Sequence, residues 1–193
     1  ARVTELTGNP DPYAAEKKRF NRSATKLAPE LQARITTAAD PLRTAVLVAI
    51  AGNIIDFGVR DGVREEHVLD ALEHSLGSAL QEDTFARFKH AVETADRILY
   101  LGDNAGEIVF DRLLVEQLPK GKVTFAVKGG PILNDVTRED AAATGIDRVA
   151  RIVDNGAALP GTVLDRCSGA FQKEFAAADV IIAKGQGNYE TLN

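Results

Sequence analysis

The sequence predicts an α/β protein in which an N-terminal helical bundle precedes a Rossmann-like, mostly parallel sheet with flanking helices. Two observations support this fold class. Up to about residue 95 the apolar residues recur at helical spacing, and after residue 96 short β-prone runs alternate with helix-length connections. That alternation is typical of βαβ units, whose strands run parallel and cross over right-handedly. We therefore expect a helical domain over residues 1–95 and a Rossmann-like α/β domain over residues 96–193.

The helices of the first half have recognisable starts and ends. Pro29 is expected to interrupt and restart the first helix, because proline removes a backbone donor. Asp40 and Pro41 predict the next start, since aspartate caps a helix and proline fits its first turn; Gly58 closes that helix. The expected helices cover residues 13–27, a continuation from Pro29, 41–57, 64–76 and 83–95. Together they make a bundle of about five helices.

Polar residues follow every expected strand. The expected strands cover residues 98–101, 123–127, 149–153 and 180–183. Because the carboxyl ends of parallel strands open on one edge of the sheet, their following loops are brought together there. Those loops contain residues 102–107, 128–135, 154–156 and 184–190, which are rich in glycine, acid, amide and lysine. This edge is therefore the candidate ligand site.

Oxygen-bearing side chains on two of these loops predict a divalent metal site. Asp103 and Asn104 follow the first strand, and Asp135 lies in the loop after the second. Mg²⁺ and Mn²⁺ prefer oxygen ligands and usually keep positions for water and substrate oxygens. A cation bound by these three residues would polarise a phosphoryl oxygen and activate a water molecule. We therefore expect the metal to hold a phosphate.

Two lysines and a glycine loop suit the phosphate. Lys128 and Lys184 each follow an apolar strand directly, so their charge can neutralise phosphate oxygens. Close approach by backbone amides is expected from the loop formed by Gly185, Gln186, Gly187 and Asn188. This loop and the two lysines form the predicted phosphate-binding set.

Proton transfer needs a carboxylate near the metal. We expect Glu107, or a carboxylate from the helical part, to take this role beside the metal ligand Asp103. Asn53 and Asp56 lie three residues apart, on one face of an otherwise apolar helical run. Polar groups in such a run need partners. They are either a helix end reaching solvent or residues that face the cleft, with Asp56 as a catalytic candidate and Asn53 as a substrate contact.

Several other chemistries have little support. Asp103 has no second aspartate two residues on, which disfavours a covalent aspartyl-phosphate, and the Gly-x-Gly-x-x-Gly spacing of nicotinamide sites is absent. Cys167 has no histidine close in sequence, so we expect a buried or incidental thiol rather than a nucleophile. The three histidines (His67, His74 and His90) are scattered over polar helix faces and are expected at the surface.

The composition is that of an ordinary globular protein. The chain has 193 residues, of which 45% are hydrophobic and 26% charged. A net charge of −5 gives no positive footprint for nucleic acid, and no apolar run approaches the roughly twenty residues of a membrane span. A single cysteine favours a reducing cytoplasm. Because the sequence opens at Ala1 and contains no methionine, we expect it to be incomplete.

Five motifs, in order, resemble the damage-control phosphatases, a metal-dependent family long catalogued as domain-of-unknown-function family 89. They are residues 8–13 (GNPDPY), 51–58 (AGNIIDFG), 102–107 (GDNAGE), 128–135 (KGGPILND) and 184–192 (KGQGNYETL). The resemblance covers essentially the whole chain and is closest to the compact prokaryotic and archaeal branch. Members of that family are typically longer at both ends, so the resemblance implies that this chain lacks terminal segments.

The resemblance also implies an activity and a site. The activity is hydrolysis of phosphomonoesters of small metabolites, often damaged sugar or cofactor phosphates, with Mn²⁺, Mg²⁺, Co²⁺ or Ni²⁺. By motif, Asp103, Asn104 and Asp135 match metal ligands, and Lys184 matches a phosphate-contacting lysine. Asn53 and Asp56 match the pocket wall of the helical part. The expected partner is a small phosphometabolite, with neither nucleic acid nor membrane involved.

Two further hypotheses come from different functional classes. A metal- or phosphate-binding module would bind the same ligands without releasing phosphate. A nucleotide-binding enzyme on a Rossmann-like scaffold would show adenine or nicotinamide protection without a metal requirement, since fold alone does not settle function. A metal-dependent phosphatase that uses metal-activated water is the leading interpretation.

Overall fold

The structure, a computed structural model, describes residues 6, 8–54 and 80–192. The predicted helix end at Gly58, the predicted helix over 64–76 and the candidate Asp56 lie outside these residues. Within the described part of the first half, three long helices are present: α2 (Ala14–Thr37), α3 (Pro41–Ile54) and α5 (Glu82–Thr94). Asp40 caps α3 as predicted, because its Oδ1 accepts a hydrogen bond from Arg43 N at 3.0 Å.

The prediction that Pro29 interrupts the first helix is wrong. Helix α2 continues through Pro29 to Thr37. An interior proline costs about 3 kcal/mol, whereas each fully buried leucine or isoleucine contributes about 1.5–3 kcal/mol. The buried stripe of α2 extends over both sides of the proline and comprises Phe20, Ala24, Leu27, Ala28, Leu31 and Ile35. Tertiary burial along this stripe therefore outweighs the local preference for a break.

The second half forms a four-stranded, all-parallel sheet in the order β3-β2-β1-β4. The strands are β1 (Ile98–Leu101), β2 (Val123–Val127), β3 (Arg151–Asp154) and β4 (Val180–Ala183). Three of them have the predicted bounds. The third begins two residues later than predicted, because the amides of Val149 and Ala150 donate to Ile146 O, which closes the short helix η1 (Ile146–Arg148).

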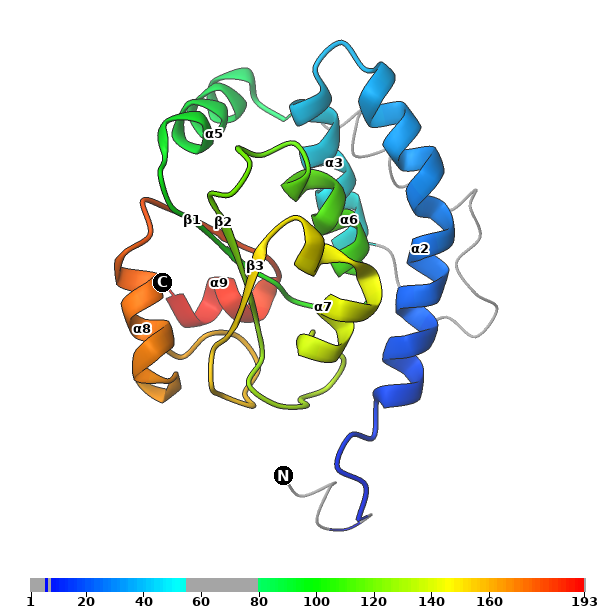
Figure 1. The fold of residues 1–193 in the computed structure, drawn as a ribbon, viewed down its shortest axis with the longest axis vertical. Helices are drawn as coiled ribbons and strands as arrows, with labels where there is room; N and C mark the ends of the chain where they lie inside the picture. The colour runs from blue at the N-terminus through cyan, green and yellow to red at the C-terminus, as the bar shows by residue number, and fades with distance from the viewer. Residues whose placement is uncertain (1–5, 7, 55–79, 193) are drawn as a thin grey trace.

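Helices cover both faces of the sheet (Figure 1). One face packs against α6 (Glu107–Val115), and α6 in turn packs against α2, α3 and α7 (Arg138–Thr144). The other face packs against the region that holds η2 (Leu164–Arg166), α8 (Gly169–Ala176) and α9 (Gln186–Leu192). Successive residues of β1 alternate between these two cores, as strand geometry requires.

The core formed with α6 crosses the predicted boundary near residue 95. It joins residues of α2 and α3 to inward-facing residues of β1 and β2, such as Tyr100 and Phe125, whose rings stack at 5.1 Å. The division into domains 1–95 and 96–193 stays a prediction. Among the described helices, none combines the length and the apolar character that a membrane span needs.

Candidate active site

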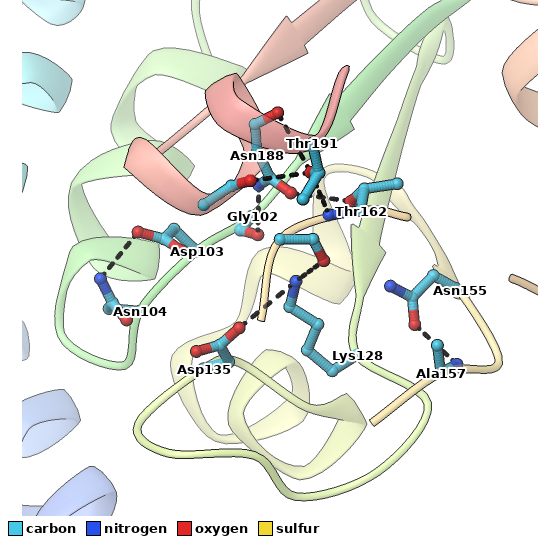
Figure 2. Close-up of polar contacts among 12 residues, drawn as sticks. Gly102, Asp103, Asn104, Lys128, Asp135, Asn155, Ala157, Thr162, Asn188 and Thr191 are labelled. Carbon is cyan, nitrogen blue, oxygen red and sulfur yellow. Dashed lines mark hydrogen bonds and ion pairs between the residues drawn. The ribbon is translucent and has the colours of Figure 1, made fainter. Parts of the chain in front are cut away.

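The loop between β1 and α6 carries three of the predicted site residues. Asn104 Nδ2 donates to Asp103 Oδ2 at 2.8 Å (Figure 2). It also donates to Glu107 Oε1 at 2.7 Å, so one amide joins two carboxylates. Gly102, the first residue after β1, packs directly against the Phe125 ring, because a Cβ at this position would lie only 2.7 Å from the ring. With the amide nitrogen used in this way, Asn104 Oδ1 is the oxygen left for a cation.

The loop after β2 lies directly beside the first loop. Val136 N donates to Asp103 O at 2.8 Å, and Ala105 N donates to Asn134 O at 2.9 Å. These bonds form an isolated antiparallel bridge between Asn104 and Asp135. The structure therefore brings the backbones of all three predicted metal ligands together, although they come from different βα units.

The carboxylate of Asp135 is buried, and the half-buried Asp103 lies close enough to interact with it electrostatically. Burial, together with the nearby Asp135, raises the pKa of Asp103 to about 6, although Lys128 and Lys184 oppose the shift. Burial likewise raises the pKa of Asp135, with Lys128 again opposing. A cation bound between these two acids would lower both pKa values, because a nearby positive charge favours the ionised carboxylate.

Glu107, the first residue of α6, is also buried. Its pKa is raised to about 7, chiefly by burial and also by Asp111, although Lys184 opposes the shift. Its Oε2 lies 3.6 Å from Lys184 Nζ but has no hydrogen-bond partner within the described part of the chain. A carboxyl with a pKa near neutrality suits the predicted role in proton transfer.

Lys184 connects the β4–α9 loop to two helices. Its Nζ donates to Asp111 Oδ1 at 2.9 Å and to Ala49 O of α3 at 2.8 Å. Burial alone would lower the pKa of Lys184, but Asp111 and Glu107 outweigh it, and the pKa is raised. The ammonium is thus held charged, with two of its three N–H donors used inside the protein.

Lys128 is buried beside Asp135 (Figure 2). Its Nζ donates to Gly161 O and lies 3.3 Å from Asp135 Oδ2. That contact is an ion pair without hydrogen-bond geometry, and Asp135 Oδ2 has no hydrogen-bond partner among the described residues. Lys128 therefore places a positive charge beside the predicted metal ligand Asp135.

The four loop residues predicted to bind phosphate have different environments. Gly185 has φ +81°, and a Cβ there would lie 1.9 Å from Asp103 Oδ2, so only glycine fits against this carboxylate. Asn188 is fully buried: its Nδ2 donates to Lys184 O at 2.8 Å, and its Oδ1 accepts from Thr162 Oγ1 at 2.7 Å (Figure 2). Gln186 is exposed and donates to Glu190 Oε1 at 2.6 Å. Gly187 lies against Gly161.

The remaining candidates and two omissions complete the site. Asn53 lies in the last turn of α3, but its side chain is not among the described atoms. Asp56 lies wholly outside the described residues. Sequence reasoning missed Asp111, although its position four residues after Glu107 on one helix places the two acids on the same face. Asp111 Oδ1 accepts hydrogen bonds from Lys184 and, at 2.6 Å, from Tyr100 OH. Sequence reasoning also missed Asn21, whose Oδ1 accepts a hydrogen bond from Gly106 N.

The donor atoms present suit a hard divalent cation. No group of three or more His, Cys, Asp or Glu side chains is placed to hold a metal ion in residues 6, 8–54 and 80–192. The candidate set instead contains two carboxylates and one carboxamide, Asp103, Asp135 and Asn104. Buried oxygens of Asp135 and Glu107 lack hydrogen-bond partners among the described residues, and Gly185 packs closely against the Asp103 carboxylate. These all-oxygen donors fit Mg²⁺ or Mn²⁺.

Known proteins match this chain over essentially its whole length. The family model for the damage-control phosphatase ARMT1-like domain matches residues 1–193. An uncharacterized protein of Methanocaldococcus jannaschii is 40% identical over 98% of this chain and 64% of its own length. A damage-control phosphatase of Archaeoglobus fulgidus is 37% identical over 100% of this chain and 67% of its own length.

A solved structure agrees with the fold. The crystal structure of a DUF89 family protein from Pyrococcus horikoshii has a TM-score of 0.85 at 36% identity and covers 99% of this chain. The match includes 66% of that protein, so this chain spans about two thirds of the length of the relatives it matches. The chain belongs to the damage-control phosphatase family.

Proposed function

We propose that this chain carries the site of a metal-dependent phosphatase that hydrolyses phosphomonoesters of small metabolites, such as sugar or cofactor phosphates. Family membership supports the reaction class. The single observation that supports the site most is the junction of the β1–α6 and β2–α7 loops. There, the backbones of Asn104 and Asp135 form a bridge, and the buried Oδ2 of Asp135 lacks a hydrogen-bond partner among the described residues.

The residues that would hold the cation are Asp103, Asn104 and Asp135. A divalent cation bound there would polarise a phosphoryl oxygen and lower the pKa of a bound water molecule. Mn²⁺, Mg²⁺, Co²⁺ and Ni²⁺ all accept oxygen ligands, so this set of oxygen donors supports a divalent cation of this group. The backbone bridge between Asn104 and Asp135 fixes the two loops before a ligand arrives.

Lys128 and Lys184 supply positive charge to the phosphate. Each ammonium has three donors. Each makes one hydrogen bond to a backbone carbonyl, and each also faces a site carboxylate, Asp135 or Glu107. Their contribution is therefore mainly electrostatic, in a buried setting where charge acts strongly. Asn53, Asp56 and the loop of residues 185–188 are proposed to line the substrate pocket.

Glu107 is the proposed proton-transfer group. It begins α6 beside Asn104, and burial brings its pKa to about 7. A group with a pKa close to the working pH is present in useful amounts in both protonation states. Glu107 can therefore take a proton from the attacking water or return one to the leaving alcohol.

The test is a phosphate-release screen over phosphorylated metabolites, with and without Mn²⁺. It compares the wild type with Asp103→Ala and with Asp96→Ala as a matched control, because Asp96 precedes the opposite end of β1 and is exposed. We expect Mn²⁺-dependent release in the wild type and the control. In Asp103→Ala we expect a loss beyond about 100-fold, the upper range for an outer-shell partner of a metal.

Three results would overturn this proposal. Hydrolysis that is independent of metal, or undiminished in Asp103→Ala, removes the role of the predicted ligands. Mn²⁺ binding without phosphate release over the whole panel would instead identify a non-catalytic binding module.

A further inference from the structure

Helix α2 places two buried polar residues on the side that faces the site loops. Lys17 and Asn21 lie four residues apart, on one face of the helix, and are 4% and 5% exposed. Asn21 Nδ2 donates to Asp140 Oδ1 at 2.9 Å. Lys17 Nζ lies 3.3 Å from Asp140 Oδ2 and 3.0 Å from Asp11 Oδ2. These four residues, Asp11, Lys17, Asn21 and Asp140, form what we call the α2 network.

The α2 network reaches the first metal-ligand loop through one bond. Asn21 Oδ1 accepts a hydrogen bond from Gly106 N at 2.8 Å. Gly106 caps α6 with φ 88°, between the predicted ligands Asp103 and Asn104 and the catalytic candidate Glu107. The amides at a helix N-terminus have no partner inside the helix, so this buried amide needs an outside acceptor. Asn21 is that acceptor.

The same network reaches the second metal-ligand loop through Asp140. Asp140 Oδ2 accepts from Thr137 N at 2.9 Å and from Thr137 Oγ1 at 2.8 Å, which fixes the start of α7. Thr137 lies two residues after the predicted ligand Asp135. One side chain, Asn21, therefore contacts both the backbone of the first loop and Asp140, whose carboxylate binds Thr137 at the end of the second loop.

We propose that Asn21 is a positioning residue of the candidate site, which holds the β1–α6 loop and the start of α7 in the relative placement that one cation needs. This inference rests on the proposed function, because that proposal supplies the cation. The placement of the two loops is argued from the contacts of the α2 network. The two loops also contact each other directly, through Val136 N and Ala105 N. Asn21 adds a tie from outside the sheet, from a helix that contributes no predicted ligand.

The test compares Asn21→Ala with Lys18→Ala. Lys18 is the next residue to Lys17 and pairs with Glu139 at 3.1 Å, so it also links α2 to α7, but this ion pair is exposed. Three quantities are measured: the Mn²⁺ dissociation constant, amide hydrogen exchange at Gly106, and the melting temperature. For Asn21→Ala we expect Mn²⁺ binding weakened by about tenfold, the lower end of the range for outer-shell partners, and faster exchange at Gly106. For Lys18→Ala we expect neither change.

A second pair of variants applies if Asn21→Ala does not fold. Asn21→Asp places a carboxylate against Asp140, whereas the double variant Asn21→Asp with Asp140→Asn again sets one amide donor opposite one carboxylate acceptor, with the two roles exchanged between the positions. We expect weakened Mn²⁺ binding in the single variant and recovery to within about threefold of the wild type in the double variant.

The outcomes separate this inference from the proposed function. A lower melting temperature with unchanged Mn²⁺ affinity and unchanged Gly106 exchange would show that Asn21 only stabilises the fold, and the inference fails. Failure of the double variant to recover would also overturn it. A wild type that binds Mn²⁺ through Asn21-dependent loops yet releases no phosphate would leave the inference intact and remove the proposed function.

Discussion

The two ends of the parallel sheet both carry charged residues but place them in opposite environments. At the amino ends of the strands, Arg151 pairs with Glu174 at 2.5 Å in an exposed contact, and the hydrogen bond from Arg151 lowers the pKa of Glu174. At the carboxyl ends, burial raises the pKa values of Asp103 and Glu107 to about 6 and about 7. The ionised form of a carboxyl group is stabilised at the amino ends and disfavoured at the carboxyl ends.

Shape does not distinguish the two ends as clearly as charge does. A cavity of about 290 Å³ opens at the amino ends, lined by residues such as Lys122, Arg151 and Glu174. Opposite charges there neutralise one another, as Lys122 also pairs with Asp96 at 3.2 Å. Acids held together against their electrostatic preference are more typical of a functional site than a hollow is. The comparison therefore selects the carboxyl ends.

The largest contrast is expected between two isosteric acid-to-amide changes. Asp111→Asn removes the buried carboxylate that accepts from Lys184 and Tyr100, whereas Glu174→Gln breaks the exposed pair with Arg151. We expect the first to lower the free energy of unfolding by about 3 kcal/mol, the lower end for a broken buried pair because Glu107 still faces Lys184. The second is expected to cost less than about 1 kcal/mol. Urea denaturation measures both, and similar small losses would show that the buried charges do not interact as described.

A second contrast uses two glycines with nearly the same backbone angle. Gly121, before β2, has φ +78° and open space around it; Gly185 has φ +81° and lies against Asp103. Gly121→Ala is expected to cost about 1–2 kcal/mol from the left-handed backbone alone. Gly185→Ala should cost more and also weaken Mn²⁺ binding, because the new Cβ must displace a predicted metal ligand. Calorimetric titration with Mn²⁺ measures this, and equal affinity in both variants would separate Gly185 from the metal site.

Much of this arrangement was predictable from local sequence. Strands β1, β2 and β4 have short apolar runs with polar or glycine-rich ends, and parallel pairing alone brings Asp103 and Asp135 to one edge. The continuity of α2 through Pro29 was not predictable, because it depends on burial against α6. Asn21 and Asp111 are single polar residues on helices, a pattern that ordinarily indicates solvent. Their burial depends on elements more than 70 residues away, Gly106 for Asn21 and Lys184 for Asp111.

The smallest expected effect is a pH dependence of stability without metal. Because the folded-state pKa of Glu107 is raised from 4.5 to about 7, the folded protein keeps a proton that the unfolded chain releases between these values. Its contribution to stability is therefore present below about pH 4.5 and is lost as the pH rises through 7. In EDTA, the wild type should lose roughly 2–4 °C in melting temperature relative to Glu107→Gln between pH 5 and 8, the shift given by about 1 kcal/mol. If the melting temperatures of the two proteins change with pH in the same way over this range, the buried state of Glu107 is contradicted.

The central claim is that the acids at the carboxyl ends of the strands form one cation site, and a Mn²⁺ titration of the wild type and of Asp135→Asn tests it most directly. Asparagine keeps the shape of Asp135 but removes the charge beside Lys128 and Asp103. The account predicts that Mn²⁺ at about 100 times its dissociation constant stabilises the wild type by about 2.7 kcal/mol, and that the same concentration has little effect on Asp135→Asn. Equal stabilisation of both proteins by Mn²⁺ would contradict it.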